Sequence, residues 1–220
     1  MTLTEAKRIV VTPAIESYLE RQVEPPSKAQ QRLIERTHAL GGVAEMQIPH
    51  EQGVLLTLLT RIANASTVVE VGTFTGYSTL AFALGVSDGG VVHTYDISEQ
   101  WLEIATEAWE EAGVGDMIKQ HIGPAATELA QLPDDEFVDI VFLDADKVGY
   151  IGYWDLLVPR VRPGGLLLAD NVLYAGEAAD PDRQGNAAAI DLFNHHVRAD
   201  ERVESVLLPI ADGLTIARKK

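Results

Sequence analysis

The sequence contains no cysteine. Disulfide bonds and zinc sites built on thiolates are therefore excluded, and the chain is compatible with a reducing compartment. It also lacks an uninterrupted run of about 18 apolar residues, the length needed to span a membrane as a helix. The first 20 residues have neither the long apolar core nor the small-residue cleavage site of a signal peptide. We expect a cytoplasmic protein with no membrane partner.

Basic residues are scarce. The 220 residues include 17 Lys and Arg against 33 Asp and Glu, for a net charge of −16 at pH 7. Because nucleic-acid binding depends on lysine and arginine contacts to phosphates, we expect no nucleic-acid partner. Hydrophobic residues make up 46% of the chain, which is enough to build a full core at this length. We predict a single domain spanning residues 1–220.

The hydrophobic pattern predicts an α/β fold in which strands and helices alternate from residue 67 onward. The alternation is typical of a parallel sheet with helices on both faces. A short turn at 211–213 predicts that the last two strands form an antiparallel hairpin at one edge. The predicted strands are 67–72, 90–97, 117–123, 137–145, 165–172, 203–210 and 213–219. The predicted helices are 4–22, 28–40, 51–64, 76–85, 98–114, 125–132, 148–161 and 187–200.

Three local signals refine this pattern. Ser98 is a plausible N-cap for the helix at 98–114. The segment "RPGG" at 162–165 closes the predicted helix at 148–161. The loop at 174–186, polar and rich in small residues, is a candidate for a mobile flap.

The segment "EVGTFTGYS" carries a glycine turn at the end of the first predicted strand. Its Gly72-x-x-x-Gly76 spacing matches neither the dinucleotide pattern Gly-x-Gly-x-x-Gly nor a phosphate-binding loop ending in Gly-Lys-Ser/Thr. Asp96 ends the next strand, where an acid can bind both hydroxyls of a ribose. Together these features indicate a nucleoside ligand without a bound pyrophosphate, and S-adenosylmethionine (SAM) fits. The alternative is that the glycines serve packing and Asp96 caps the following helix.

Polar side chains follow two later strands, in "FLDADK" and "LLADNV". Asp144, Asp170 and Asn171 would meet at the carboxyl edge of a parallel sheet. Two carboxylates and an amide oxygen form a hard, all-oxygen set that suits Mg²⁺. Lys147, three residues beyond Asp144, could accept a proton from a hydroxyl held there. The alternative is that these aspartates cap helices and start turns.

Several segments of the sequence resemble those of a known family. "MQIPHEQGVLL", "VVEVGTFTGYSTLAFA", "YDIS", "FLDADK", "LLLADNVLYAG" and "LPIADGLTIARK" are similar to segments of the cation-dependent O-methyltransferases. These are the small catechol and caffeoyl-CoA O-methyltransferase-like enzymes of the SAM-dependent, Rossmann-like class. The resemblance runs from about Pro25 to the C-terminus. It implies a seven-stranded, mostly parallel sheet with an antiparallel last strand and helices on both faces.

The resemblance also implies a role for individual residues. The methionine part of SAM would contact Glu70, Gly72, Thr73 and Ser78; the ribose would bind Asp96; the adenine would lie against Ile97 and Ala125; and Ile48 would line the same pocket. The divalent cation, most simply Mg²⁺, would bind Asp144, Asp170 and Asn171. Asp144 would also lie beside SAM, and Lys147 would be the catalytic base. Met46, Trp154 and Tyr174 would contact the acceptor.

Two positions depart from the family pattern. Pro124 stands where the adenine segment usually has Asp, and Tyr174 stands where a tryptophan is common. The N-terminal helical segment 1–45 would contribute to the substrate site or to a dimer contact, and the resemblance implies a homodimer.

The implied reaction is methyl transfer from SAM to a hydroxyl of a small, catechol-like aromatic, with a place in bacterial secondary metabolism. Three alternatives remain open: a methyltransferase for a monophenol, an aminobenzoate-type ring or a carrier-linked phenol; an NAD-dependent dehydrogenase, which lacks its glycine pattern here; and a non-catalytic nucleoside-binding module.

Overall fold

Seven strands form one mixed sheet in the computed structural model, which describes residues 9–220. The order across the sheet is β3-β2-β1-β4-β5-β7-β6. Strands β1 to β5 run parallel, and β7 lies antiparallel between β5 and β6. This confirms the predicted parallel sheet and terminal hairpin. The strand bounds are β1 Thr67–Val71, β2 Val91–Asp96, β3 Ile118–Ile122, β4 Val138–Leu143, β5 Val161–Ala169, β6 Val203–Leu208 and β7 Leu214–Lys219.

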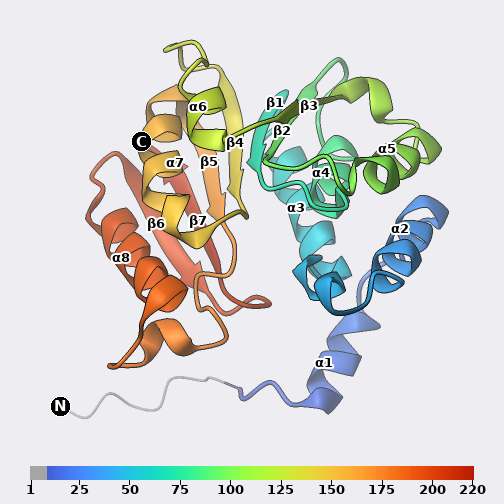
Figure 1. The fold of residues 1–220 in the computed structure, drawn as a ribbon, viewed down its shortest axis with the longest axis horizontal. Coiled ribbons are helices and arrows are strands. Elements are labelled where there is room, and N and C mark those ends of the chain that lie inside the picture. The colour runs from blue at the N-terminus through green and yellow to red at the C-terminus, as the bar shows by residue number, and fades with distance from the viewer. Residues whose placement is uncertain (1–8) are drawn as a thin grey trace.

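Helices cover both faces of the sheet (Figure 1). One apolar cluster packs α2, α3, α4 and α5 on the first face, and a second packs α6, α7 and α8 on the other. The helix bounds are α1 Pro13–Glu20, α2 Lys28–His38, α3 His50–Ile62, α4 Tyr77–Ala83, α5 Leu102–Glu111, α6 Ala125–Leu129, α7 Tyr150–Leu157 and α8 Gly185–Ala199. Short 3₁₀ segments are η1 Gly41–Met46, η2 Gly115–Met117, η3 Lys147–Gly149, η4 Val158–Arg160 and η5 Glu177–Ala179.

The central strand β4 shows why the sequence folds in this way. All six of its residues are buried, because helices lie over both faces of the sheet at this position. A strand buried on both faces is expected to be almost continuously apolar, and "VDIVFL" is, with one exception. The exception, Asp139, accepts hydrogen bonds from the backbone N–H groups of Ser66 and Thr67 and forms an ion pair with Arg162.

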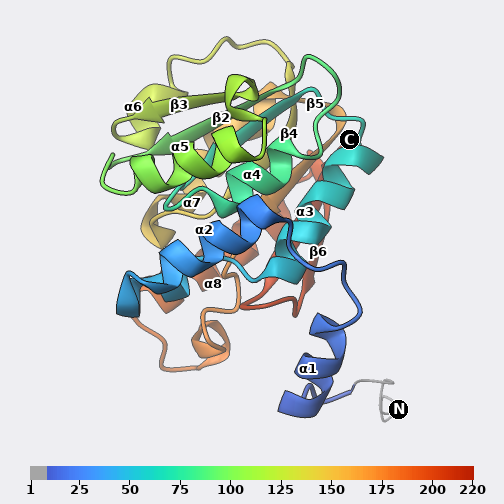
Figure 2. The same cartoon turned by 90° about the vertical axis from the view of Figure 1, so that its right-hand side faces the viewer.

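Helix α1 stands apart from both helical layers (Figure 2). None of its residues is buried, and it begins only at Pro13, where the sequence pattern predicts a helix over 4–22. Residues 9–12 form no regular structure, and residues 4–8 of that prediction lie outside the described residues. Thr12 accepts a hydrogen bond from Ile15 and so caps the helix just before its proline. None of the helices in residues 9–220 combines the length and apolar content needed to cross a membrane.

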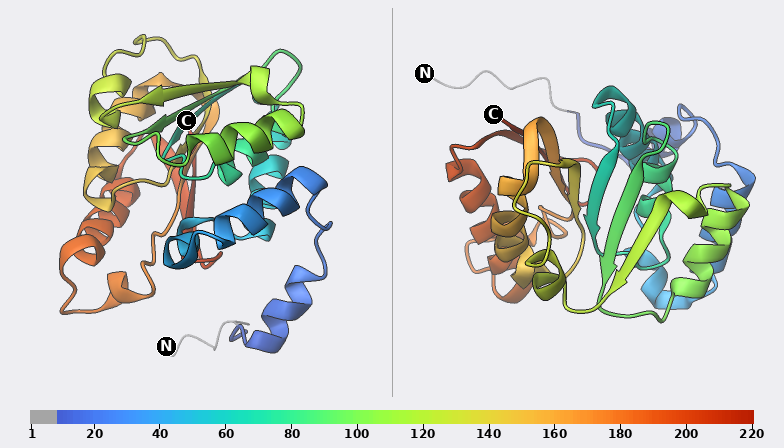
Figure 3. Two further views of the ribbon diagram at one scale, coloured as in Figure 1. Left: turned by 45° about the vertical axis from the view of Figure 1, so that its right-hand side comes forward. Right: turned by 90° about the horizontal axis from the view of Figure 1, so that it is seen from above.

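Besides that of α1, two predicted element boundaries differ clearly from the structure. Helix α5 begins at Leu102, because Ser98 is used in a turn instead: its hydroxyl accepts a hydrogen bond from the backbone N–H of Gln100. Strand β5 begins at Val161, so the "RPGG" segment lies within the strand rather than closing a helix. Gly165 allows this because a Cβ at that position would lie 2.8 Å from the carbonyl oxygen of Asp139 on β4. The view from above in Figure 3 shows β5 running alongside β4.

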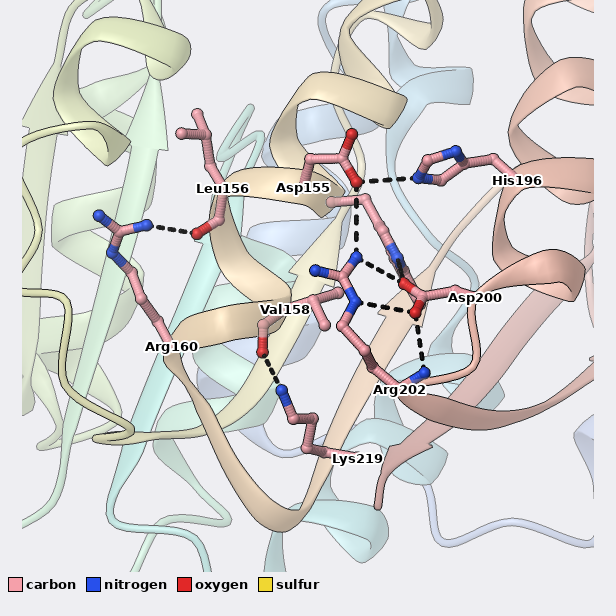
Figure 4. Close-up of polar contacts among 9 residues, drawn as sticks. Asp155, Leu156, Val158, Arg160, His196, Asp200, Arg202 and Lys219 are labelled. Atoms are coloured by element: carbon pink, nitrogen blue, oxygen red, sulfur yellow. Dashed lines mark hydrogen bonds and ion pairs between the residues drawn. The ribbon is translucent and has the colours of Figure 1, made fainter.

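A polar network fixes α7 against α8 and the start of β6 (Figure 4). Arg202 donates to both carboxylate oxygens of Asp200, at 2.8 and 2.7 Å. His196 on α8 lies 2.9 Å from Asp155 on α7. Trp154, also on α7, donates its ring N–H to Asp200 at 2.9 Å. These contacts fix the C-terminal half of α7 against α8 and the start of β6.

Candidate active site

The carboxyl ends of three neighbouring strands lie side by side, which brings the predicted site residues together. The backbone N–H of Asp144 donates to Val71 at 2.8 Å, and that of Asp170 donates to Leu143 at 2.9 Å. The N–H of Gly72 donates to Tyr95 at 2.8 Å. These backbone bonds continue the parallel ladder one residue beyond each strand. The side chains that follow β1, β4 and β5 therefore share one edge of the sheet.

Gly72 is required where β1 ends. Its φ is +104°, and a Cβ at this position would lie 1.8 Å from the carbonyl oxygen of Asp144. Only glycine adopts such a conformation freely and permits such a close backbone approach. The glycine turn thus brings the backbone after β1 against the backbone after β4.

Glu70 is fully buried on β1 and is held by hydroxyl groups. Thr94 on β2 donates to its Oε2 at 2.7 Å, and Thr79 on α4 donates to the same oxygen. Its other oxygen, Oε1, has no hydrogen-bond partner among residues 9–220. Burial raises the pKa of Glu70 to about 7, opposed by hydroxyl groups that include that of Ser78. A buried acid with one unpartnered oxygen suits a polar or cationic ligand group.

Asp96 holds the glycine turn in this structure. Its Oδ2 accepts hydrogen bonds from the backbone N–H groups of Thr73 and Phe74, both at 3.0 Å. Its Oδ1 accepts from the N–H of Ser98 at 3.0 Å. The carboxylate therefore joins the end of β2 to the turn after β1, at the position predicted for the ribose. Ribose binding itself stays a prediction.

Lys147 is the centre of the polar cluster after β4. Its ammonium group donates to Asn171 Oδ1 at 2.6 Å, to the Tyr150 hydroxyl at 2.7 Å and to Asp144 Oδ1 at 3.2 Å. The Lys147 side chain is 12% exposed and that of Asp144 is 19% exposed, so the pair is screened from most of the solvent. Burial raises the pKa of Asp144, and the Lys147 charge opposes this shift.

Asp170 lies deeper, with 2% of its surface exposed. Its Oδ1 is buried and has no hydrogen-bond partner in the part of the chain that the structure describes. Burial and the nearby Asp144 charge raise the pKa of Asp170 to about 7, and Lys147 is among the groups that oppose the shift. Asn171 follows with a left-handed φ of 54°, a conformation that asparagine tolerates better than most residues. This backbone turns the Asn171 side chain toward Lys147.

The predicted metal ligands fit a divalent cation. Asp144 and Asn171 already direct oxygens at one positive group, the Lys147 ammonium. Asp170 adds a buried carboxylate oxygen without a partner, and oxygen donors are the set that Mg²⁺ prefers. Over residues 9–220, no group of three or more His, Cys, Asp or Glu side chains is arranged to hold a metal. The predicted set differs from such a cluster because its third donor, Asn171, is an amide.

The remaining predicted SAM contacts differ in exposure. Thr73 and Ser78 are buried at 4% and 6% exposure, whereas Ile97 is 70% exposed. Ala125 is the first residue of α6. Ile48 is buried and also lines a cavity of about 580 Å³ together with His50 and other residues. That cavity lies among α2, η1 and the start of α3, and its lining does not include the predicted metal ligands.

The three predicted acceptor residues occupy different environments. Met46 is 53% exposed at the end of η1. Tyr174 lies in the loop after β5, where its hydroxyl accepts a hydrogen bond from Asn186 at 3.1 Å. Trp154 is fully buried in the core, with its ring packed edge-on against Phe193. Its burial does not support the predicted acceptor contact, so we do not keep Trp154 in the site.

The loop that carries Asn171 and Tyr174 is anchored to the terminal hairpin. The side chain of Asp212 accepts a hydrogen bond from the backbone N–H of Ala175 at 2.6 Å. Its carbonyl oxygen accepts from the N–H of Leu173 at 2.9 Å. The turn between β6 and β7 therefore helps to hold the loop after β5, which connects the end of the chain to the site.

Sequence reasoning missed Tyr150 and Gln52. Tyr150 contacts Lys147 from three residues further on, a separation that one helical turn brings together. Gln52 is a fully buried amide on α3, on the same stripe as Leu56 and Thr60. A glutamine on the buried face of a helix is the signal that could have drawn attention to it.

Comparisons with known proteins agree with this geometry. The family model described as O-methyltransferase matches residues 20–220. Probable caffeoyl-CoA O-methyltransferase 2 of Dictyostelium discoideum is 40% identical over 174 residues, which cover 77% of this chain and 75% of that protein. Caffeoyl-CoA O-methyltransferase 5 of Nicotiana tabacum is 33% identical over 97% of this chain and 94% of its own.

Solved structures share the fold. A methyltransferase of Podospora anserina, PaMTH1, bound to S-adenosylhomocysteine (SAH), is 27% identical, covers 98% of this chain and 100% of its own, and has a TM-score of 0.88. An O-methyltransferase of Bacillus cereus in complex with SAH is 29% identical, covers 94% of this chain and 97% of its own, and has a TM-score of 0.85.

The fold and the site thus define a Rossmann-like, SAM-dependent methyltransferase. The chain belongs to the O-methyltransferase family whose members include the caffeoyl-CoA O-methyltransferases. The prediction of a SAM-dependent O-methyltransferase is confirmed.

Proposed function

We propose that this protein transfers a methyl group from SAM to one hydroxyl of a small, catechol-like aromatic acceptor with the help of a divalent cation. The observation that carries the proposal is the cluster after β4 and β5. There, one lysine ammonium contacts Asp144 Oδ1 and Asn171 Oδ1 at 3.2 and 2.6 Å, directly beside the glycine turn. Cofactor binding alone does not require this lysine.

The residues around the glycine turn bind SAM in this proposal. Glu70, Thr73 and Ser78 contact its methionine part, and Gly72 lets the ligand approach the backbone. Asp96 binds the ribose, with Ile97 and Ala125 beside the adenine and Ile48 lining the same pocket. Holding two reactants in a reactive geometry can supply up to about 7–11 kcal/mol of the barrier.

Asp144, Asp170 and Asn171 would hold the cation, Mg²⁺ being the simplest choice. When bound, such a cation makes a neighbouring hydroxyl more acidic. Lys147 Nζ accepts the hydroxyl proton. The acceptor oxygen then forms a bond to the methyl carbon as the bond from sulfur to that carbon breaks, and SAH is released. Proton transfer of this kind contributes typically 10²–10⁴-fold in rate.

The charges of the site favour a small acceptor over a CoA ester. The loops at this edge of the sheet, residues 72–76, 97–101, 123–124, 144–149, 170–184 and 209–213, carry two basic side chains. Lys147 is held by Asp144 and Asn171, and Arg183 is paired with Asp191. Phosphate groups are bound chiefly by arginine, lysine and backbone N–H groups. A catechol without phosphates therefore suits these loops better than the coenzyme A thioester in the names of the relatives.

Other acceptors define the alternatives: a monophenol, an aminobenzoate-type ring or a carrier-linked phenol. Tyr174 and Met46 are the residues that we expect to shape the acceptor pocket. Three further expectations stay predictions: that residues 1–45 contribute to the acceptor site or a dimer contact, that the protein is a cytoplasmic homodimer, and that it serves secondary metabolism.

The test combines substitution with cation removal. In Lys147→Met, we expect kcat for a catechol to fall by about 10²-fold or more while the Kd for SAM stays unchanged. Lys119→Met, which changes an exposed lysine on β3, is the matched control. We also expect a chelator to abolish methylation of catechol and added Mg²⁺ to restore it.

The acceptor is decided by a panel of catechol, a monophenol and caffeoyl-CoA assayed with SAM. Full activity in excess chelator would refute the role of the cation. Equal losses of turnover and SAM affinity in Lys147→Met would refute the role of Lys147 as base.

A further inference from the structure

Within residues 9–220, three of the six buried side-chain atoms that lack a hydrogen-bond partner belong to Gln52 and Asp170. Gln52 is 0% exposed, and neither its Oε1 nor its Nε2 makes a hydrogen bond. Asp170 is 2% exposed, and its Oδ1 also lacks a partner. A buried polar group without a hydrogen bond costs about 1–3 kcal/mol. Such groups in a native fold therefore call for a functional explanation.

Gln52 and Asp170 are neighbours although 118 positions separate them in the sequence. The Gln52 amide lies close enough to Asp170 to lower the pKa of its carboxyl group. Burial and the Asp144 charge raise that pKa by more. The two side chains nevertheless do not meet in hydrogen-bond geometry. An amide donor and a carboxylate oxygen, both without partners, thus lie next to each other in the interior.

The backbone of Gln52 is firmly placed. A Cβ on the next residue, Gly53, would lie 2.8 Å from the ring of Tyr77, so the first turn of α3 packs directly on α4. His50 lies 2.7 Å from the Tyr77 hydroxyl and strengthens the same contact. The N–H of Gln52 donates to Pro49 at 3.1 Å. These contacts fix the backbone from which the Gln52 side chain reaches the surroundings of Asp170.

We propose that Gln52 is a positioning residue for Asp170: its amide N–H donates to Asp170 Oδ1 and orients the carboxylate for the divalent cation. The proposal rests on the cation-dependent function above. An amide can present its nitrogen or its oxygen by turning over, so the donor can face Asp170. Outer partners of this kind fix the orientation of metal-binding side chains, and their loss typically costs 10–100-fold in metal affinity.

The test measures cation binding rather than turnover. In Gln52→Leu, which removes both polar atoms at similar size, we expect the Kd for Mn²⁺ to rise about 10–100-fold. Electron paramagnetic resonance of free Mn²⁺, titrated in the presence of SAH, gives this constant directly. The Kd for SAH, measured by calorimetry without Mn²⁺, should not change.

Thermal unfolding separates a positioning role from a structural one. Because Gln52→Leu removes buried polar atoms that have no partner, its Tm without cations should equal or exceed that of the wild type. The rise in Tm on adding Mn²⁺ should be smaller. Gln52→Met, whose side chain is unbranched, should give the same Tm without cations and the same smaller rise with Mn²⁺. Agreement between the two variants shows that the branched shape of leucine is not the cause.

The matched control is Gln30→Leu. Gln30 is also a buried amide, at 8% exposure, but it completes the capping box of α2 with Ser27. Its loss should lower the Tm and leave the Kd for Mn²⁺ unchanged. Wild-type Mn²⁺ affinity in Gln52→Leu would overturn the proposal and leave the methyltransferase function intact. A wild-type protein that binds no Mn²⁺ would overturn both this proposal and the cation dependence of the proposed function.

Discussion

Replacing Gly72 by alanine tests whether the close approach of two backbones after β1 and β4 builds the site. In the folded protein, Gly72 has a φ of +104°, and its added Cβ would lie 1.8 Å from the Asp144 carbonyl oxygen and 2.6 Å from its carbonyl carbon. These are backbone atoms in adjacent strands, so no side-chain rotation relieves the contact. One of the two strand ends has to move.

The expected cost has two parts. A left-handed conformation costs a residue other than glycine about 1–2 kcal/mol. Forcing an extra methyl group into a packed interior costs typically 1–3 kcal/mol more. Gly72→Ala should therefore lower the free energy of unfolding by about 2–5 kcal/mol. It should also weaken SAH binding, because the shift displaces the Thr73 and Asp144 backbones beside the cofactor.

Gly89→Ala is the matched control. Gly89 has a φ of +76°, and a Cβ added there would have no other atom within 4 Å, so the substitution carries the backbone cost of about 1–2 kcal/mol and no steric cost. Urea denaturation gives both free energies, and calorimetry gives SAH affinity, which should be unchanged in this control. The reasoning is refuted if the two variants are equally stable, or if Gly72→Ala binds SAH as the wild type does.

Three further predictions concern the surroundings of the site. Asp212→Ala should raise the KM for a catechol more than the Kd for SAM, because Asp212 anchors the loop after β5; Asp212→Asn, which keeps an acceptor oxygen, should restore most of the loss. Tyr150→Phe should destabilise the protein by about 1.5–3 kcal/mol in urea denaturation, since the Lys147 ammonium loses a hydrogen bond. Arg202 holds the pKa of Asp200 well below its usual value, so this contact stabilises the fold above about pH 4 and the stabilisation is lost as the pH falls below that. Unfolding in acid should therefore be less pH-dependent in Asp200→Asn than in the wild type.

Local sequence patterns were sufficient for the outline of the site. Gly72 and Gly76 mark a turn at the end of an apolar strand. Asp144 follows the apolar strand β4, and Asp170 and Asn171 follow the apolar strand β5. In a parallel sheet, the ends of successive strands must meet at one edge, whatever the details of packing. The convergence of these residues was therefore predictable from their positions relative to the strands, and the structure brings them together.

Contacts between distant segments were not predictable in this way. The approach of Lys147 to Asn171 depends on the left-handed backbone after β5, and the place of Gln52 beside Asp170 depends on how α3 packs against α4. Trp154 was predicted at the acceptor pocket but lies in the core, because the face of α7 that carries it packs against Phe193 of α8.

Some features of this protein follow from local sequence and others from tertiary packing. The sequence alone determined the alternation of strands and helices, the glycine turn and the polar residues at strand ends, because these depend on neighbours within a few positions. Only the tertiary structure decided which buried polar atoms are satisfied, which aromatic residues face the core and where β5 begins. The environment of those groups is formed by segments far apart in the chain, whose packing no short stretch of sequence specifies.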